Sequence, residues 1–181
     1  MSIETSRLVL VPSSPQGLVV LIEQPESFAE VAGFEAAPGL RDFFVSDEVS
    51  PDWMAELREA QGADPWHYGF LILERQSGLA IGSAGFKGPT DVAGIVEIAY
   101  GVVPDYAGQG YATEAAAGLV GYARETGQAT LVRAHTLPER NASTRVLEKC
   151  GFKHVGEVVD PEDGPVWRWE AATPEGAPGA V

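Results

Sequence analysis

The segment from Glu97 to Glu114 carries the residues with the clearest capacity for chemistry. An apolar, β-branched run ends at Pro104, two glycines follow at Gly108 and Gly110, and helical spacing begins directly after them. Glycine lets a backbone approach a ligand closely, and the unpaired N–H groups at the start of a helix attract anions. The segment therefore predicts a phosphate or pyrophosphate site. A tight strand-to-helix turn without a ligand is the alternative.

A dinucleotide-binding turn of the Rossmann type also has to be considered, because Gly108-Gln109-Gly110 follows a strand and opens a helix. That fingerprint requires a small residue shortly after the second glycine and an acidic residue about 20 positions further on. Thr113 stands at the first of these positions, and residues 131–136 contain no acid. The hairpin-like runs before the loop also disagree with a parallel βαβ unit. The sequence therefore argues against this alternative.

Glu97 is the candidate general base. Side chains alternate between the two faces of a strand, so Glu97 shares its face with Ala99 and Gly101, whose small size leaves room for a groove. Ile98 and Tyr100 point the other way, into apolar packing. A carboxylate beside such a groove can take a proton from an amine, directly or through water. A solvated or hydrogen-bonded strand glutamate is the alternative.

Together with residues 140–152, this segment resembles the GNAT superfamily of acetyl-CoA-dependent N-acetyltransferases. The similar branch is the one typified by the enzymes that acetylate the N-termini of ribosomal proteins. The family pattern Glu-Ile-Gly-Tyr, Pro, Gly-x-Gly-x-Ala-Thr-Glu-Ala stands here as Glu97-Ile98-Ala99-Tyr100, Pro104 and residues 108–115, and the opening Thr5-Ser6-Arg7-Leu8 matches as well. Two departures are visible: Ala107 replaces the usual Arg or Gln, and the asparagine of the second motif stands one position late, at Asn141, because Arg140 occupies its place.

The resemblance implies a fold and a set of contacts. The fold is α+β, a mixed and mostly antiparallel sheet of about seven strands with helices on both faces, splayed between strands four and five. Pantetheine lies in the splayed cleft and bonds to the backbone near Val102 and Val103. The pyrophosphate is cradled by the loop, and the candidate ligand-binding residues there are Gly108, Gln109, Gly110, Tyr111, Ala112 and Thr113, with Asn141 from the second motif. The resemblance also implies that Glu97 is the base.

Ser143 is the second candidate catalytic residue. Counting back from the closing Gly151-Phe152 of the second motif places the family serine there, and its hydroxyl is expected to donate a hydrogen bond near the departing sulfur. A helix N-cap is the alternative for Ser143, because serine caps helices well. Direct attack in a ternary complex needs no enzyme nucleophile, so Cys150 is interpreted as a small packed residue.

The elements that must position these residues follow from the hydrophobic pattern. Alternating or continuous apolar runs predict strands over residues 7–12, 68–74, 79–86, 95–103, 130–136, 152–159 and 166–171. Helical spacing predicts helices over 109–125 and 143–149, and a broken helical region over 15–62. Trp167 and Trp169 alternate with polar residues on the last strand and are expected to pack.

Composition limits the classes of partner. The chain has 181 residues, with 26 acidic against 12 basic side chains and a formal net charge of −14. Nucleic acid is excluded as a partner by this charge, whereas a cationic acceptor is favoured, with solubility alone as the alternative reason. The three histidines, His67, His135 and His154, show no ligand spacing, so no metal is predicted.

Size and cysteine content bound the organisation. We expect a single acetyltransferase domain over residues 1–171 and a disordered tail, rich in Pro and Gly, over 172–181. The one cysteine and the absence of a signal-like start favour the cytoplasm, and the apolar run 18–22 is too short to span a membrane. A monomer and a homodimer both remain open.

The sequence thus predicts transfer of an acetyl group from acetyl-CoA to a primary amine, on a protein N-terminus or a small molecule, by direct attack in a ternary complex. A non-catalytic acyl-CoA-binding sensor or interaction module is the alternative. No motif identifies the acceptor amine.

Overall fold

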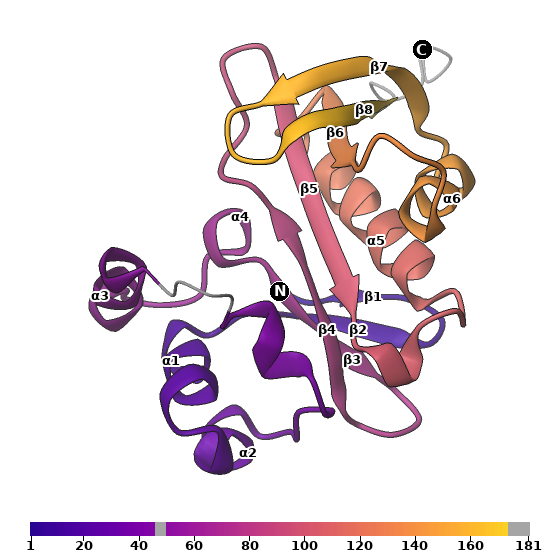
Figure 1. Cartoon of the computed structure of the whole chain (residues 1–181). Helices are drawn as coiled ribbons and strands as arrows, with labels where there is room; N and C mark the ends of the chain where they lie inside the picture. The colour runs from indigo at the N-terminus through magenta and orange to yellow at the C-terminus, as the bar shows by residue number, and fades with distance from the viewer. Residues whose placement is uncertain (46–49, 174–181) are drawn as a thin grey trace.

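The computed structural model describes residues 1–45 and 50–173 and shows one sheet with helices on it (Figure 1). The strands are β1 (Ile3–Glu4), β2 (Leu8–Pro12), β3 (Phe70–Glu74), β4 (Ala80–Phe86), β5 (Ile95–Val102), β6 (Leu131–Thr136), β7 (Lys153–Asp160) and β8 (Gly164–Ala172). The α-helices are α1 (Pro15–Glu23), α2 (Phe28–Ala32), α3 (Pro51–Glu59), α4 (Pro65–Tyr68), α5 (Tyr111–Thr126) and α6 (Ala142–Lys149), and the 3-10 turns are η1 (Pro25–Ser27), η2 (Leu40–Phe43) and η3 (Pro104–Tyr106). The expected α+β class is confirmed.

The eight strands form one sheet in the order β1-β2-β3-β4-β5-β6-β8-β7. Within the described residues, neighbouring strands run antiparallel except for β5 and β6, which pair in parallel. The count exceeds the expected seven because β1 has only two residues, too few to show alternation in a sequence. The last hairpin places β8 beside β6 and leaves β7 at the edge of the sheet.

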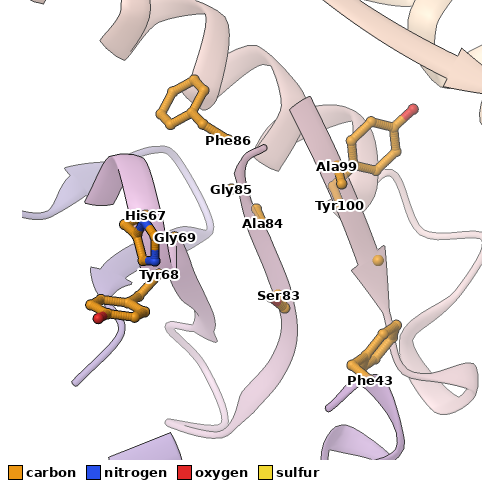
Figure 2. Close-up of a pocket in the computed structure, with 11 residues that line it drawn as sticks. Phe43, His67, Tyr68, Gly69, Ser83, Ala84, Gly85, Phe86, Ala99 and Tyr100 are labelled. Atoms are coloured by element: carbon orange, nitrogen blue, oxygen red, sulfur yellow. The ribbon is translucent and has the colours of Figure 1, made fainter. Parts of the chain in front are cut away.

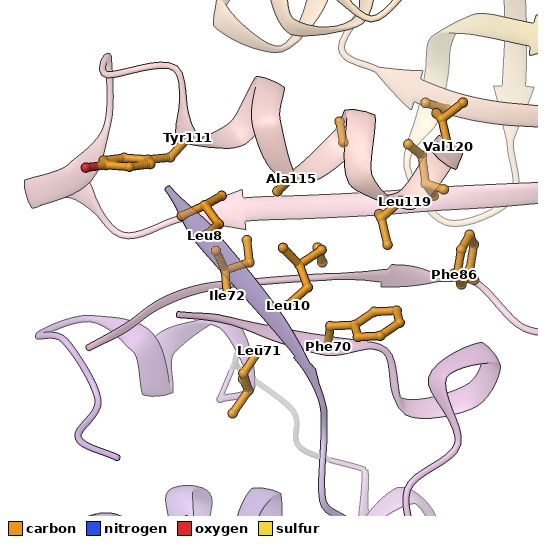
Figure 3. Packing of buried hydrophobic residues seen from close by; sticks show 14 of the residues in the cluster. Leu8, Leu10, Phe70, Leu71, Ile72, Phe86, Tyr111, Ala115, Leu119 and Val120 are labelled. Carbon is orange, nitrogen blue, oxygen red and sulfur yellow. The ribbon is translucent and has the colours of Figure 1, made fainter. Parts of the chain in front are cut away.

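Helix α5 covers one face of the sheet with a stripe of buried side chains at helical spacing (Figure 3). Ala115 and Leu119 of this stripe are fully buried, as are Leu10 and Ile72 beneath them on β2 and β3. Leu71 points to the opposite face, as strand alternation requires. Burial of an aliphatic side chain of this size stabilises a fold by about 1.5–3 kcal/mol, so this stripe fixes α5, and with it the loop before α5, against the sheet.

The other face of the sheet is covered by the broken helical region that the sequence predicted (Figure 1). Leu18 and Ile22 of α1 pack with Met54 and Leu57 of α3 in a cluster of their own. Helix α4 and turn η2 lie against β4. Helices therefore cover both faces of the sheet, as expected.

The last strand packs as predicted, and the packed part of the chain continues past the expected boundary. Trp169 is buried, and its indole N–H donates to the Thr136 hydroxyl at 3.1 Å. Thr173 is also buried, and its hydroxyl donates to the carbonyl of Ala129. The packed chain thus reaches two residues past the expected boundary at 171, and residues 174–181 of the predicted tail lie outside the described residues.

None of the helices within the described ranges has the length and hydrophobicity that crossing a bilayer requires.

Candidate active site

Strands β5 and β6 pair at one end only. Residues 95–97 face residues 131–133 in parallel register. Beyond this point β5 continues along β4, and β6 continues along β8, so the two strands diverge and a cavity of about 360 Å³ opens between them. The cavity lining includes Glu97, Tyr100, His135 and Ser143. The splay expected between the fourth and fifth predicted strands is confirmed.

The register of β5 decides which of its peptide groups face this gap. The N–H of Val103 donates to the carbonyl of Ile81 at 2.8 Å, and the carbonyl of Glu97 accepts from Lys87 at 2.8 Å. Because antiparallel pairs alternate in this way, the backbone groups of Tyr100 and Val102 point away from β4 and into the gap.

Val103 differs from Val102 in this respect. Its N–H is bonded to Ile81, and its carbonyl accepts from the N–H of Tyr106 at 3.0 Å. The backbone of Val103 therefore has no free N–H for the expected contact, whereas the N–H of Val102 faces the gap.

The glycine loop has the geometry of an anion site. Gly108 and Gly110 have φ angles of 74° and 83°, in the left-handed region that only glycine enters without strain. Gly110 caps α5, and the first backbone bond of that helix runs from the N–H of Glu114 to Gly110. Within the described chain, the N–H groups of residues 108–113 have no acceptor. These amides line the start of a 16-residue helix, where its dipole favours negative charge.

A second cavity, of about 310 Å³, opens in front of these amides. It is lined by Gly108, Gly110, Tyr111, Ala112 and Thr113 from the loop and by α6. Arg145 and Lys149 of α6 also line it, one helical turn apart. In the described chain neither forms an ion pair, so both cations are available to an anionic ligand. They supply the positive charge that Ala107 does not.

Arg7, in the bend directly before β2, anchors the loop. Its guanidinium donates to the carbonyl of Gln109 at 2.9 Å, pairs with Glu114 at 2.8 Å and lies 4.3 Å from the ring centre of Tyr111. Glu114 also accepts from the hydroxyl of Thr5 at 2.6 Å and from the Arg7 N–H at 2.7 Å. Partial burial opposes ionisation of Glu114, but these hydrogen bonds and the charge of Arg7 outweigh it and lower its pKa.

Gln109 and Asn141 have internal roles that the sequence did not indicate. The Gln109 side chain turns back to the carbonyl of Asp105 at 3.4 Å, which leaves its N–H as the group that faces outward. Asn141 is the N-cap of α6, where its side-chain oxygen accepts from the N–H of Thr144 at 3.0 Å. Only the side-chain NH₂ of Asn141 is left for a ligand.

Ser143 lies in the first turn of α6, and because Asn141 is the cap, the N-cap interpretation of Ser143 is wrong. The Ser143 hydroxyl lies 3.2 Å from the Tyr100 hydroxyl inside the gap. Burial raises the pKa of Tyr100 to about 12, so Tyr100 stays protonated and can donate to Ser143 at any physiological pH. The expectation that Tyr100 points into apolar packing is therefore wrong for its hydroxyl end.

Glu97 lies on the opposite face of β5 from Tyr100, as predicted. Its Oε1 atom is 3.2 Å from the ammonium of Lys87 and 2.9 Å from Nδ1 of His135. The carboxylate is therefore a hydrogen-bonded strand glutamate and also lines the gap. The hydrogen-bonded strand glutamate is thus observed, and its place on the gap leaves the role of general base open to it.

A hollow of about 290 Å³ lies over β4 and β5 (Figure 2), and it shares Ala99 and Tyr100 with the lining of the gap. Its floor is a square of small residues at facing positions of β4 and β5, namely Ser83 opposite Gly101 and Gly85 opposite Ala99. Phe43, His67 and Tyr68 form its walls. The two small residues expected to form a groove, Ala99 and Gly101, therefore line a hollow that extends onto β4, while Glu97 lines the neighbouring gap.

Cys150 is partly buried, and its thiol contacts the carbonyl of Thr113 at 3.4 Å. Burial raises the pKa of this thiol, which disfavours the thiolate. Among residues 1–45 and 50–173, no group of three or more His, Cys, Asp or Glu side chains is placed to hold a metal ion.

Several residues of the site were not predicted as such. Arg145 and Lys149 carry a usable signal, because residues four apart share one helix face. No such signal in the sequence marks Lys87, His135 or Arg168. Lys87 and His135 reach Glu97, and Arg168 reaches His135, only because of the register between separate strands.

The chain is similar to known acetyltransferases in both sequence and structure. A family model described as acetyltransferase (GNAT) domain matches residues 7–153. The curated protein YjdG of Bacillus subtilis (strain 168), an uncharacterised N-acetyltransferase, is 27% identical over 119 residues, which cover 66% of this chain and 62% of that protein. The match thus spans less than two thirds of that relative.

Two solved structures share the fold over nearly their whole length. Ribosomal-protein-S5-alanine acetyltransferase from Vibrio fischeri has a TM-score of 0.68 at 15% identity, covering 98% of this chain and 100% of that chain. RimL, a ribosomal L7/L12 α-N-protein acetyltransferase in complex with coenzyme A, has a TM-score of 0.66 at 13% identity, covering 95% and 98%.

Proposed function

Because the chain belongs to the family of GNAT acetyltransferases, we propose that it is an acetyl-CoA-dependent N-acetyltransferase acting on a primary amine. The observation that carries this proposal is the gap between β5 and β6. Unpaired loop amides lie toward one end of this region, and Glu97 lines the gap beside an open hollow.

The loop and α6 are the proposed site for the phosphates of acetyl-CoA. The amides of residues 108–113 offer a row of donors, and Arg145 and Lys149 add two positive charges on the same cavity. Backbone donors at a helix start together with basic side chains suit a pyrophosphate. The backbone of Val102 is proposed to bond the pantetheine arm.

The hollow on β4 and β5 is the proposed acceptor site. Small side chains on its floor, Ser83 and Ala99, leave room for a substrate. The Phe43 ring packs over Gly101, and the backbone of Gly69 packs over Gly85. Glu97 is the next residue on the face that Ala99 and Gly101 share. An amine bound there lies next to a carboxylate.

Acetyl-CoA supplies an acetyl group activated as a thioester. In the proposed mechanism Glu97 accepts the proton that the amine loses as its nitrogen attacks. Ser143 donates a hydrogen bond to the departing sulfur, and Tyr100 supports Ser143 through the 3.2 Å contact between their hydroxyls. No acyl-enzyme is required, so Cys150 takes no part.

We propose a cationic acceptor. Residues 15–66, which include Phe43 of the hollow, hold 11 of the 26 acidic side chains but only 2 of the 12 basic ones. Negative potential concentrates cations near a site and raises their rate of association. A protein N-terminus and a small-molecule amine both fit this description.

The test measures release of free CoA thiol from acetyl-CoA over a panel of primary amines and peptides. We expect turnover with at least one cationic amine, and we expect Glu97→Gln to lower kcat by roughly 10- to 1000-fold at neutral pH, with part of the loss regained as pH rises and the amine deprotonates in solution. Affinity for acetyl-CoA, measured by calorimetry, should be unchanged in this variant. Binding of acetyl-CoA without turnover for any amine would instead favour an acyl-CoA sensor.

A salt series tests the cationic acceptor separately. Screening weakens long-range attraction, so kcat/KM for the best amine should fall as salt rises from about 50 to 500 mM. An acidic or neutral analogue of similar size is the control. A flat profile for both would mean that the charge does not select the acceptor.

A further inference from the structure

A line of three polar side chains crosses the sheet from β8 to β5. Arg168 and His135 are direct register partners on β8 and β6, and their side chains meet on the same face at 3.1 Å. His135 then reaches Glu97 on β5 at 2.9 Å. The His135 side chain is only 13% exposed, so solvent does not replace these partners easily.

The direction of each hydrogen bond follows from the chemistry of arginine. A guanidinium has N–H donors and no acceptor, so the contact between Nε of Arg168 and Nε2 of His135 requires Nε2 to accept. In the neutral ring the proton then lies on Nδ1. Nδ1 is the atom that faces Glu97, and it therefore donates to the carboxylate.

The two oxygens of Glu97 are used unequally. Lys87 and His135 both contact Oε1. Within the described residues Oε2 has no hydrogen-bond or ion-pair partner, which makes it the oxygen free to face an amine. Lys87 is 52% exposed and ends a flexible stem, so it adds charge but fixes direction poorly. The less exposed, planar ring of His135 sets the orientation.

We propose that Arg168 is a positioning residue for the acetyl transfer: it selects the Nδ1–H tautomer of His135, and His135 in turn holds Glu97 with Oε2 directed at the acceptor. This inference rests on the proposed function of Glu97. Arg168 and the carboxylate of Glu97 both favour the Nδ1–H tautomer, because the carboxylate accepts from Nδ1 and Arg168 donates to Nε2. Without Arg168 only Glu97 favours it, so the other tautomer, which turns a ring lone pair toward Oε1, becomes more accessible. The carboxylate then rotates away from that lone pair, and the base loses its alignment.

The chain offers a matched control in Arg133. It lies on β6 on the same face, its guanidinium bonds Glu170 at 2.7 and 3.0 Å, and both side chains are 22% exposed. Arg133→Met thus removes another arginine from the same face of the sheet, the register partner of Glu97 itself, without touching the contact to His135. A merely structural role for Arg168 would make the two variants alike.

The first measurement is nitrogen NMR of the histidine rings, which distinguishes a protonated from an unprotonated ring nitrogen. We expect Nδ1–H for His135 in the wild type and in Arg133→Met, and a shift toward Nε2–H in Arg168→Met. The two ring-nitrogen resonances that disappear in His135→Asn are assigned to His135. This readout does not depend on turnover, so it tests the tautomer even if no amine is acetylated.

The second measurement is kinetic. Arg168→Met should lower kcat about tenfold with KM for acetyl-CoA unchanged, while Arg133→Met stays near wild type. An asparagine amide can replace Nδ1–H but not Nε2, so His135→Asn should retain more activity than His135→Gln. An Nε2–H tautomer in the wild type, or equal kinetics for Arg168→Met and Arg133→Met, would overturn the proposal. An inactive wild type with the expected tautomers would instead count against the proposed function alone.

Discussion

Replacing Arg7 by methionine tests whether the bend before β2 holds the phosphate loop in its binding geometry. The change keeps an unbranched stem but removes the bond to Gln109, the ion pair with Glu114 and the contact with the ring of Tyr111. The side chains of the pair are 43% and 16% exposed, so solvent screens it only in part. A charge-assisted hydrogen bond in this setting is worth about 1–2 kcal/mol, and the cation–π contact adds about 0.5 kcal/mol.

The expected loss of stability is therefore about 2 kcal/mol, which lowers the melting temperature by about 4–8 °C in a domain of this size. Part of the loss appears in binding, because the loop must then be ordered by the ligand. If about 1 kcal/mol is transferred in this way, the Kd for acetyl-CoA rises about fivefold.

Urea denaturation and calorimetry of acetyl-CoA binding measure the two effects. Arg75→Met is the matched control, because Arg75 lies close by and bonds Thr5 and Glu4 at 3.1 Å, but its side chain and that of Glu4 are 41% and 73% exposed. It should cost less than about 1 kcal/mol and leave the Kd unchanged. Equal losses in both variants, or an unchanged Kd in Arg7→Met, would refute the idea that Arg7 prearranges the loop.

Three further outcomes are expected. The pKa of Glu114 is lowered below its ordinary 4.5, so this carboxylate stabilises the fold above pH 4.5 and ceases to do so as pH falls through its folded pKa. Glu114→Gln should therefore be less stable than the wild type at pH 7. In unfolding curves measured below pH 4.5 this difference in stability should shrink. Cys150→Ala should leave turnover nearly intact, and the wild-type thiol, whose pKa burial raises, should react slowly with a thiol reagent at pH 8; loss of activity would point to a covalent route through the thiol. Ser143→Ala should lower kcat about tenfold with acetyl-CoA affinity little changed, and because Tyr100 and Ser143 act through one contact, adding Tyr100→Phe should cost little more; fully additive losses would separate their roles.

Local patterns predicted what depends on neighbours in the chain. The glycines of the loop, the helix that follows it and the face of β5 that carries Glu97 all follow from spacing and alternation, and the structure has them in place. The resemblance in two motifs was sufficient to expect the splayed sheet. The first three features share a physical cause, since spacing and alternation act between near neighbours in the chain, whereas the splay came from the resemblance alone.

Register and long-range pairing set the rest. The line from Arg168 to Glu97 exists because β8 lies beside β6 and because β6 starts in parallel with β5, which no local pattern encodes. Val103 was expected to offer its backbone, but the antiparallel register commits its N–H to Ile81. Alternation along β5 assigned Tyr100 to apolar packing. Alternation gives the face of the strand but not the position that the hydroxyl at the far end of the ring reaches.

The incomplete pairing of β5 and β6 also divides the sheet mechanically. Among the described residues, strands β1 to β5 and strands β6 to β8 are joined by ladder pairing over residues 95–97 and 131–133 alone. The amide hydrogens of Tyr100, inside β5, and of Val102, at its end, therefore lack a partner strand. We expect them to exchange with solvent as fast as loop amides do. A ligand in the gap lies where the hydrogen bonds between β5 and β6 would otherwise continue. Binding should slow that exchange. It should also couple the motions of strands β1 to β5 to those of strands β6 to β8, because the ligand then bridges the two parts of the sheet.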